Sequence, residues 1–182
     1  MFELWAPLSD IPAEGRVFSF SDPAIWVSPW REFSLPYTMG KDLAADLTLI
    51  PSGQGFLIKG RLTGSILVPC DRCAESMETV IDHAFQEHEE FSRPQGDADA
   101  DALMDDPSDS DLIRGRGEEA ELNVAGLLWE QFQLALPQNM ICADGCKGLC
   151  PVCGSNLNQG GCDCEVDEGD PRLAALRNLK IS

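Results

Sequence analysis

The chain has 182 residues, of which 43% are hydrophobic, and its 31 acidic residues against 13 Lys and Arg give a formal net charge of −18. This length fits one domain, or one domain with a small appended module, and no apolar run approaches the roughly 18 residues that cross a bilayer. A charge of this sign repels a phosphate backbone, so we expect no tight direct RNA binding.

The first residues, MFELWAPLSDIPAEG, lack the basic start, the apolar stretch and the small-residue cleavage site of a secretory signal. We therefore expect a cytoplasmic protein with no membrane association. In that compartment the eight cysteines favour metal binding or redox chemistry over disulfides. A disulfide framework is the alternative, but six cysteines lie between Cys142 and Cys164, whereas a fold stapled by disulfides would spread them.

Residues 1–45 scatter Trp and Phe among prolines without a sustained helical period, so we expect loops and short strands there. From Asp46 the pattern changes to the strand-like runs DLTLI, GFLIKGRL and SILVPC, separated by the turn PSGQG and by Thr63-Gly64. These runs predict an antiparallel meander. The alternating segment TVIDHAFQEHEEF predicts a further strand.

An acidic stretch follows the predicted strands. From Gln86 to Glu121 there are 13 acidic and three basic residues, a net charge of −10 and more than half of the total. Within it, residues 92–117 have few bulky side chains and two prolines, so they cannot bury enough surface to offset the entropy of ordering. We predict a mobile acidic loop, which is either a solvated insertion or a docking surface for a basic partner.

Two helices are predicted after the acidic stretch. Asn123 can cap a helix whose apolar residues recur every three or four positions until Pro137 ends it, and this helix should pack on the sheet. Asp170-Pro171, an N-cap followed by proline, opens a short C-terminal helix that runs through Leu179.

Between these helices lies the cysteine-rich segment ICADGCKGLCPVCGSNLNQGGCDCE. Structural zinc takes four thiolates at tetrahedral corners, and a CxxC turn followed by glycine, as in CPVCG, lets two sulfurs reach one ion. The short loop GSNLNQGG can bring the CDC pair back to this turn. The predicted first zinc site is therefore Cys150, Cys153, Cys162 and Cys164. A possible second site is Cys70, Cys73, Cys142 and Cys146, and an arrangement in which both CxxC turns share one ion stays open.

Other chemistries have weaker signals. A thioredoxin-like redox pair at Cys70 and Cys73 would need a helix N-terminus in a βαβ setting, and an iron–sulfur cluster also uses four cysteines. His83 and His88 lie on the predicted strand, five residues apart, and are expected to be strand residues. No phosphate-binding loop, nucleophile elbow or paired-carboxylate motif stands out, so we predict no catalytic residues.

The segments GRLTGSILVPCDRCAE, CKGLCPVCGSNLNQGGCDCE and DPRLAALRNL, together with the helix ending in LALP, resemble the large ribosomal RNA subunit accumulation protein family, YceD. The resemblance covers residues 20–180. It implies a non-enzymatic role in synthesis, processing or stability of large-subunit ribosomal RNA, in the bacterial cytoplasm or in plastids. It also carries over the cysteines of both CxxC motifs and of the C-terminal cluster.

Together these patterns predict an α+β fold, with an antiparallel sheet or open barrel, one main packed helix and a zinc-stapled C-terminal segment. Residues 1–137 form the predicted core domain and residues 138–182 the cysteine-rich segment. The partners expected for so acidic a protein are basic ribosomal proteins or pre-ribosomal particles of the large subunit. The alternatives are a thiol redox protein that uses Cys70 and Cys73, or a metal-dependent ribonuclease.

Overall fold

The computed structural model of the chain describes residues 3–53, 55–90, 112–115 and 119–165. It divides into two compact units, of which unit 1 comprises residues 1–68 and 77–140 and unit 2 residues 69–76 and 141–182. The sequence-based division after residue 137 assigned Cys70 and Cys73 to the core domain. In the structure, the turn that carries them belongs to unit 2 with the other cysteines.

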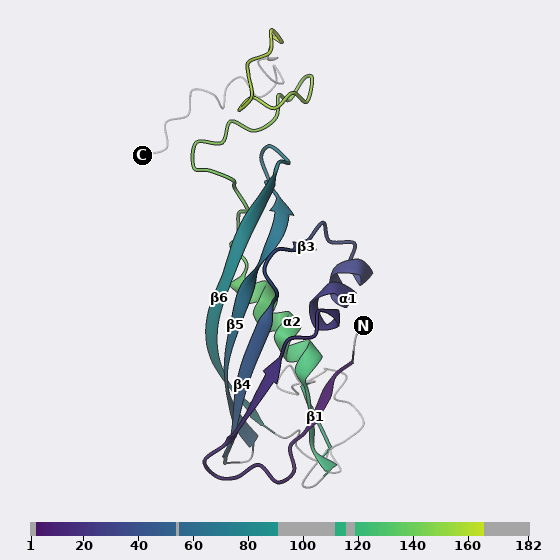
Figure 1. Cartoon of the computed structure of the whole chain (residues 1–182), viewed down its shortest axis with the longest axis vertical. Coiled ribbons are helices and arrows are strands. Elements are labelled where there is room, and N and C mark those ends of the chain that lie inside the picture. Colours follow the sequence, from purple (N-terminus) through teal and green to yellow (C-terminus); the bar gives the residue numbers. More distant parts are fainter. Residues whose placement is uncertain (1–2, 54, 91–111, 116–118, 166–182) are drawn as a thin grey trace, which may run out of the picture. The chain divides into compact units, whose positions relative to one another are not determined.

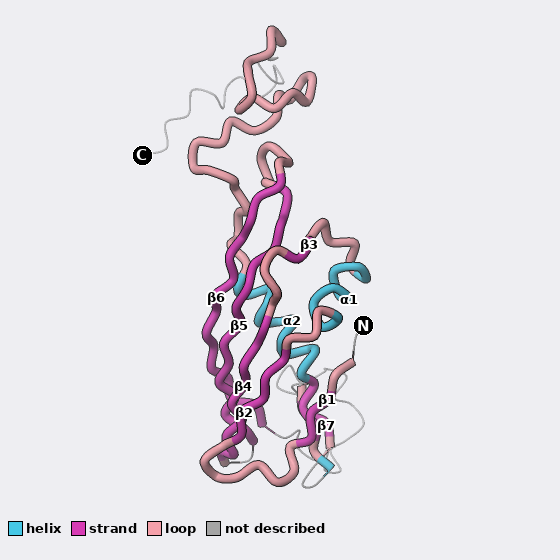
Figure 2. Tube along the Cα trace, viewed as in Figure 1, coloured by secondary structure: helices cyan, strands magenta, loops and turns pink. Residues whose placement is uncertain are grey.

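Unit 1 is built on an antiparallel sheet that has five strands among the described residues (Figures 1 and 2). The strand order is β2-β4-β5-β3, and β6 also pairs with β5. The three runs of the predicted meander correspond to β4 and β5, and the further predicted strand corresponds to β6. The bounds are Arg16–Phe20 for β2, Thr38–Met39 for β3, Ala44–Ser52 for β4, Gly55–Pro69 for β5 and Ser76–Glu90 for β6.

Strand β5 is one continuous strand, so the predicted break at Thr63-Gly64 is wrong. Gly64 has φ +141°, and a Cβ at this position would lie 2.6 Å from the Asp42 carbonyl oxygen. Glycine is needed here because another part of the backbone approaches closely, which is a common reason for glycine inside a strand. The glycine therefore marks a close approach and not a turn.

A second, smaller sheet joins the start of the chain to its middle. Its strand order is β1-β8-β7, with Trp5–Pro7, Glu121–Asn123 and Ile113–Arg114 as the respective bounds. The Arg114 guanidinium stacks over the Trp5 ring at 3.8 Å and forms an ion pair with Glu121 at 2.8 Å. Strand β7 falls inside the predicted loop 92–117; the rest of that loop, apart from residues 112 and 115, lies outside the described residues.

Helix α2, Val124–Ala135, begins where the sequence predicted. The side chain of Asn123 caps it by accepting a hydrogen bond from the Gly126 N–H at 2.9 Å. The predicted C-terminal helix near residues 170–179 lies outside the described residues.

Helix α1, Ala24–Glu32, was not predicted, because Pro23 and Pro29 suggested an irregular segment. It packs on α2 through aromatic rings, with the Trp26 and Trp30 centroids 6.0 and 5.7 Å from that of Phe132. This aromatic contact explains how a short helix with an internal proline persists.

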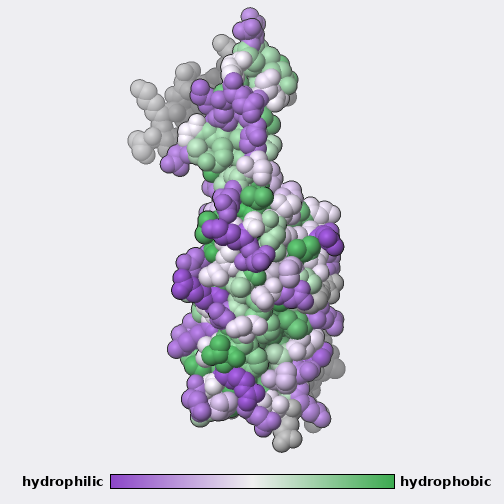
Figure 3. Space-filling view, in the orientation of Figure 1, coloured by the Kyte–Doolittle hydropathy of each residue, from purple (hydrophilic) through white to green (hydrophobic). Residues whose placement is uncertain are grey.

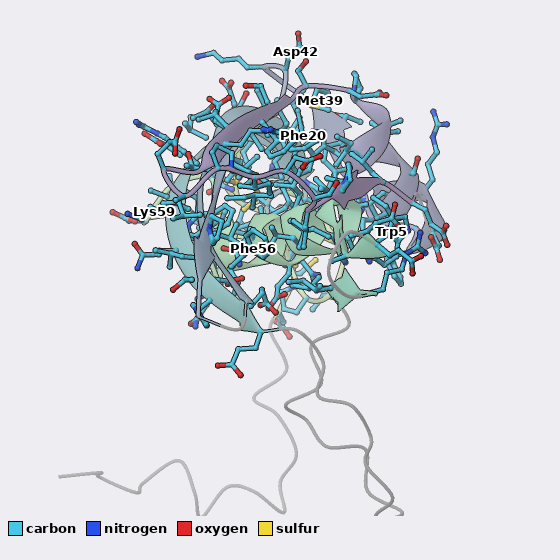
Figure 4. All side chains as sticks on the ribbon, turned by 90° about the horizontal axis from the view of Figure 1, so that it is seen from below. Trp5, Phe20, Met39, Asp42, Phe56 and Lys59 are labelled. Atoms are coloured by element: carbon cyan, nitrogen blue, oxygen red, sulfur yellow. The ribbon has the colours of Figure 1, made fainter. Side chains whose placement is uncertain are left out.

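The core of unit 1 lies between the sheet and α2. In Figure 4, Phe56 of β5 lies on the inside and Lys59 at the rim, in keeping with a buried phenylalanine and an exposed lysine. The face seen in Figure 3 mixes hydrophilic and apolar side chains, with the apolar ones in small patches. No helix in the described part of the chain is long and apolar enough to cross a membrane. The described residues thus form the predicted α+β fold of antiparallel sheets, with two helices.

Candidate metal centres

The first group of cysteines is assembled from two distant parts of unit 2. Cys70 and Cys73 lie in the turn between β5 and β6, where the Cys70 N–H donates to the Glu75 carbonyl and the Ala74 N–H to the Cys70 carbonyl, both at 2.8 Å. Ala74 takes φ +58°, which closes the turn tightly. This local geometry directs both side chains of the CxxC motif to one side, as a shared metal ligand pair requires.

Cys142 and Cys146 complete this group. The Sγ atoms of Cys70 and Cys146 lie 3.9 Å apart, those of Cys73 and Cys142 lie 3.7 Å apart, and all four lie within 4.8 Å of one another. Thiolates about 2.3 Å from one tetrahedral zinc are separated by about 3.8 Å. Three of the four cysteines are buried, with Cys142 exposed. The spacing therefore fits a single tetrahedral ion.

The second group is Cys150, Cys153, Cys162 and Cys164, whose sulfurs also lie within 4.8 Å of one another. The CPVCG turn is closed by a hydrogen bond from the Gly154 N–H to the Cys150 carbonyl at 2.9 Å, with Gly154 at φ +73°. The Val152 N–H donates to Cys150 Sγ at 3.4 Å. The structure thus gathers the same two sets of four that the sequence predicted, and the two CxxC turns fall in different sets.

Hydrogen bonds to individual sulfurs stabilise the thiolate form. The Cys142 N–H donates to Cys70 Sγ at 3.3 Å and is the main reason why the pKa of Cys70 falls to about 6. A hydrogen bond of 3.1 Å between Cys153 Sγ and Ser155 Oγ is the main cause that lowers the pKa of Cys153 to about 6. Since the thiolate is the form that binds metal, both groups are prepared for a cation.

Crowding of the sulfurs acts in the opposite direction on their neighbours. The sulfurs of Cys146 and Cys73 raise the pKa of Cys142 to about 12, and those of Cys153 and Cys162 raise the pKa of Cys164 to about 12. Adjacent thiolates repel, so four sulfurs at these distances ionise together only around a cation. The donor set fits one ion per group better than an iron–sulfur cluster, whose thiolates are spread over several irons.

A short hairpin links the two groups inside unit 2. Residues 148–150 pair with residues 155–157 around the antiparallel bridge between Leu149 and Asn156. The Leu149 N–H also donates to the Arg72 carbonyl, in the turn between Cys70 and Cys73, at 3.0 Å. The chain between Cys146 and Cys150 is therefore bonded to the first group on one side and to the loop of the second group on the other.

Sequence reasoning missed the side chains that support the sulfurs. Asn158 Nδ2 donates to Cys146 Sγ at 3.4 Å and to Asn156 Oδ1 at 2.9 Å, while its Oδ1 accepts from the Lys147 N–H at 2.8 Å. From the sequence, the loop GSNLNQGG was expected only to bring the CDC pair back to the CPVCG turn. Its two asparagines, at alternate positions beside a cysteine pair, were the signal that a donor to sulfur was present.

The two histidines belong to neither cysteine group and lie on β6, as expected for strand residues. His83 Nε2 is 3.2 Å from Gln131 Oε1 of α2, and His88 Nε2 is 3.3 Å from the Ser52 carbonyl oxygen. Gln131 is fully buried and also donates to Glu87 at 2.5 Å. This network joins β6 to α2. Within the described residues, the clusters of possible metal ligands consist of cysteines alone.

Comparison with known proteins identifies the family to which this chain is similar. A model of the family described as "Large ribosomal RNA subunit accumulation protein YceD" matches residues 58–180, more than half of the chain. The chain is 35% identical over 63 residues to "Large ribosomal RNA subunit accumulation protein YCED homolog 1, chloroplastic" of Arabidopsis thaliana, covering 35% of this chain and 20% of that protein.

Mycobacterial relatives match over a longer stretch. An uncharacterized protein of Mycobacterium tuberculosis and one of Mycobacterium bovis are each 27% identical over 138 residues, or 75% of this chain and 61% of the relative. The chain thus spans less than two thirds of the length of each of these relatives. No solved structure matches it significantly.

Proposed function

This chain belongs to the YceD family, named for accumulation of the large ribosomal RNA subunit, and on that premise we propose that it is a non-enzymatic assembly factor of the large ribosomal subunit. It acts in the cytoplasm and supports the synthesis, processing or stability of large-subunit ribosomal RNA. The observation that carries this role is the family match over residues 58–180, which includes all eight cysteines.

Each group of four cysteines holds one structural zinc ion in this proposal. Support comes from the tetrahedral spacing of the sulfurs in the first group and from the N–H groups directed at Cys70 and Cys150. Four thiolates close the coordination shell and leave no position for water or substrate, which is typical of structural sites. The ions supply folding free energy to a segment that has few apolar side chains of its own.

The partner in this proposal is a basic ribosomal protein of the large subunit. A net charge of −18 attracts a cationic protein and accelerates the encounter, whereas it opposes contact with the phosphates of RNA. An acidic carrier can hold a basic ribosomal protein until that protein meets its RNA. Holding such a protein needs no catalytic group.

The two alternative functions have less support. A thioredoxin-like pair lies at a helix N-terminus, whereas Cys70 and Cys73 lie in a turn between antiparallel strands. The low pKa of Cys70 arises from the Cys142 N–H, a contact that equally prepares a metal thiolate. A ribonuclease would need a carboxylate cluster for magnesium, and the described residues contain no cluster of ligands other than the cysteines.

A binding experiment tests the proposed partner class. Purified full-length protein is titrated with a basic large-subunit ribosomal protein and, separately, with a fragment of large-subunit ribosomal RNA, each at several salt concentrations. We expect binding of the basic protein that weakens as salt rises, and little binding of the RNA. Tight RNA binding in moderate salt, with no binding of basic ribosomal proteins, would overturn the proposal.

A further inference from the structure

The loop between the two halves of the second cysteine group reaches the first group. Its ends are fixed by Cys153 on one side and Cys162 on the other, both in the second group. From its middle, Asn158 donates to the sulfur of Cys146, which belongs to the first group, at 3.4 Å. The loop of the second group thus supplies a hydrogen-bond donor to Cys146, a cysteine of the first group.

A second contact runs between the same two parts. The carboxylate of Glu75, two residues after Cys73, accepts from Asn156 Nδ2 at 3.0 Å and from Gln159 Nε2 at 2.7 Å. Glu75 also closes the Cys70–Cys73 turn through its backbone carbonyl, which accepts from the Cys70 N–H. The loop of the second group therefore holds both sides of the first: the turn through Glu75, and Cys146 through Asn158.

We propose that Asn158 is a positioning residue that couples the two metal sites, so that a thiophilic divalent cation in either group raises the affinity of the other group for the same cation. The inference rests on the proposed binding of metal by both groups. A metal in the second group fixes both ends of the loop between Cys153 and Cys162, and this removes much of the entropy that Asn158 would otherwise lose on reaching Cys146.

The coupling acts in both directions. When the first group binds its cation, Cys146 and the Cys70–Cys73 turn become fixed, and Asn158 and Glu75 then hold the loop in the conformation that brings Cys162 and Cys164 back to the CPVCG turn. By thermodynamic linkage the gain in affinity is the same for both groups. The two ions therefore bind cooperatively, and singly loaded chains are fewer during a titration than two independent sites would give.

Cobalt titration of the reduced full chain, stripped of metal by a chelator, measures this coupling, because thiolate-bound Co²⁺ absorbs in the visible range. The C162S/C164S variant reports the affinity of the first group alone and C70S/C73S that of the second. We expect the overall constant for two ions in the unaltered chain to exceed the product of these two constants by about 5-fold or more, the usual lower range of coupling between sites.

The N158A variant keeps all eight cysteines and isolates the coupling residue. We expect N158A to bind two ions, with an overall constant that exceeds the product of the two isolated constants by a smaller factor than in the unaltered chain. When C162S/C164S is also present, N158A should change the affinity of the first group little. N139A, the same substitution at an exposed asparagine of unit 1, is the matched control and should leave the titration unaltered.

Two results overturn the coupling while leaving the metal sites in place: an overall constant equal to the product of the isolated constants, or an equal effect of N158A with and without the second group. Failure of the proposed metal binding gives a different result, because the unaltered chain then takes up fewer than two Co²⁺ ions.

Discussion

Gly148 is a single residue on which the packing of the cysteine-rich unit depends. It takes φ +77°, and a Cβ at this position would lie 2.9 Å from the Arg72 carbonyl oxygen, between the ligands of the first group. Alanine in this conformation costs about 1–2 kcal/mol, so Gly148→Ala should weaken Co²⁺ binding by about tenfold. Gly145→Ala, where an added Cβ meets no atom within 4 Å, is the control. Equal affinities of the two variants would contradict the close packing.

Glu87 provides a test at the same scale in unit 1. Burial raises its pKa, with repulsion from the Glu130 carboxylate as the second cause, while the hydrogen bond from Gln131 partly offsets the rise. A carboxyl whose pKa is higher in the folded state than in the unfolded state binds protons more readily when folded. Its ionisation therefore costs stability above the folded pKa, and the cost vanishes below the unfolded pKa.

Glu87→Gln should accordingly raise the free energy of unfolding at pH 7. The glutamine oxygen can still accept from Gln131, and because the side chain is only half-buried, water keeps the gain below about 1 kcal/mol. At pH 3 the gain should disappear. Denaturant unfolding at both pH values measures this, with Glu3→Gln as an exposed control. A gain of the same size at pH 3 would rule out ionisation of Glu87 as its cause.

At the scale of secondary structure, the start of α2 depends on its cap. Asn123→Ala removes the acceptor for the Gly126 N–H and should lower the free energy of unfolding by about 1 kcal/mol. Denaturant midpoints measured by far-ultraviolet circular dichroism report the loss. Asn139→Ala, at an exposed position after the helix, should change the midpoint little. Equal denaturant midpoints for the two variants would show that the cap does not contribute to the free energy of unfolding.

The elements that sequence reasoning recovered are those whose signal is local. The alternation of side chains along the segment predicted β6, and an N-cap followed by apolar residues at helical spacing predicted α2. Helix α1 was missed because Pro29 suggests a break, whereas its contact with Phe132 comes from a residue far along the chain. Likewise, the glycine at position 64 suggested a turn in the sequence, whereas the structure shows that it accommodates the nearby Asp42 backbone. Strand β1 pairs with β8 across more than 100 residues, a contact without a local signal.

At the scale of the whole molecule, the cysteine groups were predictable because spacing limits the choices. The CPVCG turn and the CDC pair are close in sequence, so a short loop is enough to bring their sulfurs together. Cys70 and Cys73 meet Cys142 and Cys146 across about seventy residues, and the sequence could suggest this only because those four lacked other partners. The two asparagines of the loop were a signal for the bond from Asn158, whereas the contacts of the Glu75 carboxylate depend on the folded loop and had no signal in the sequence.

The division into two units predicts how the molecule responds to metal removal. Unit 1 has its own core between the sheet and α2, whereas the described residues of unit 2 have few apolar side chains, so metal should stabilise unit 2 alone. Treatment with a chelator should speed amide hydrogen exchange in residues 69–76 and 141–165 and leave β4 and β5, up to Val68, protected. Unchanged exchange in the cysteine-rich residues would show that metal does not hold them.

The two closed tetrahedral zinc sites are central to the proposed function, and native mass spectrometry combined with elemental analysis of the protein as purified tests them most directly. We predict two zinc ions per chain, both lost together when a chelator is added. A chain that carries no metal, a single ion or iron would contradict the account.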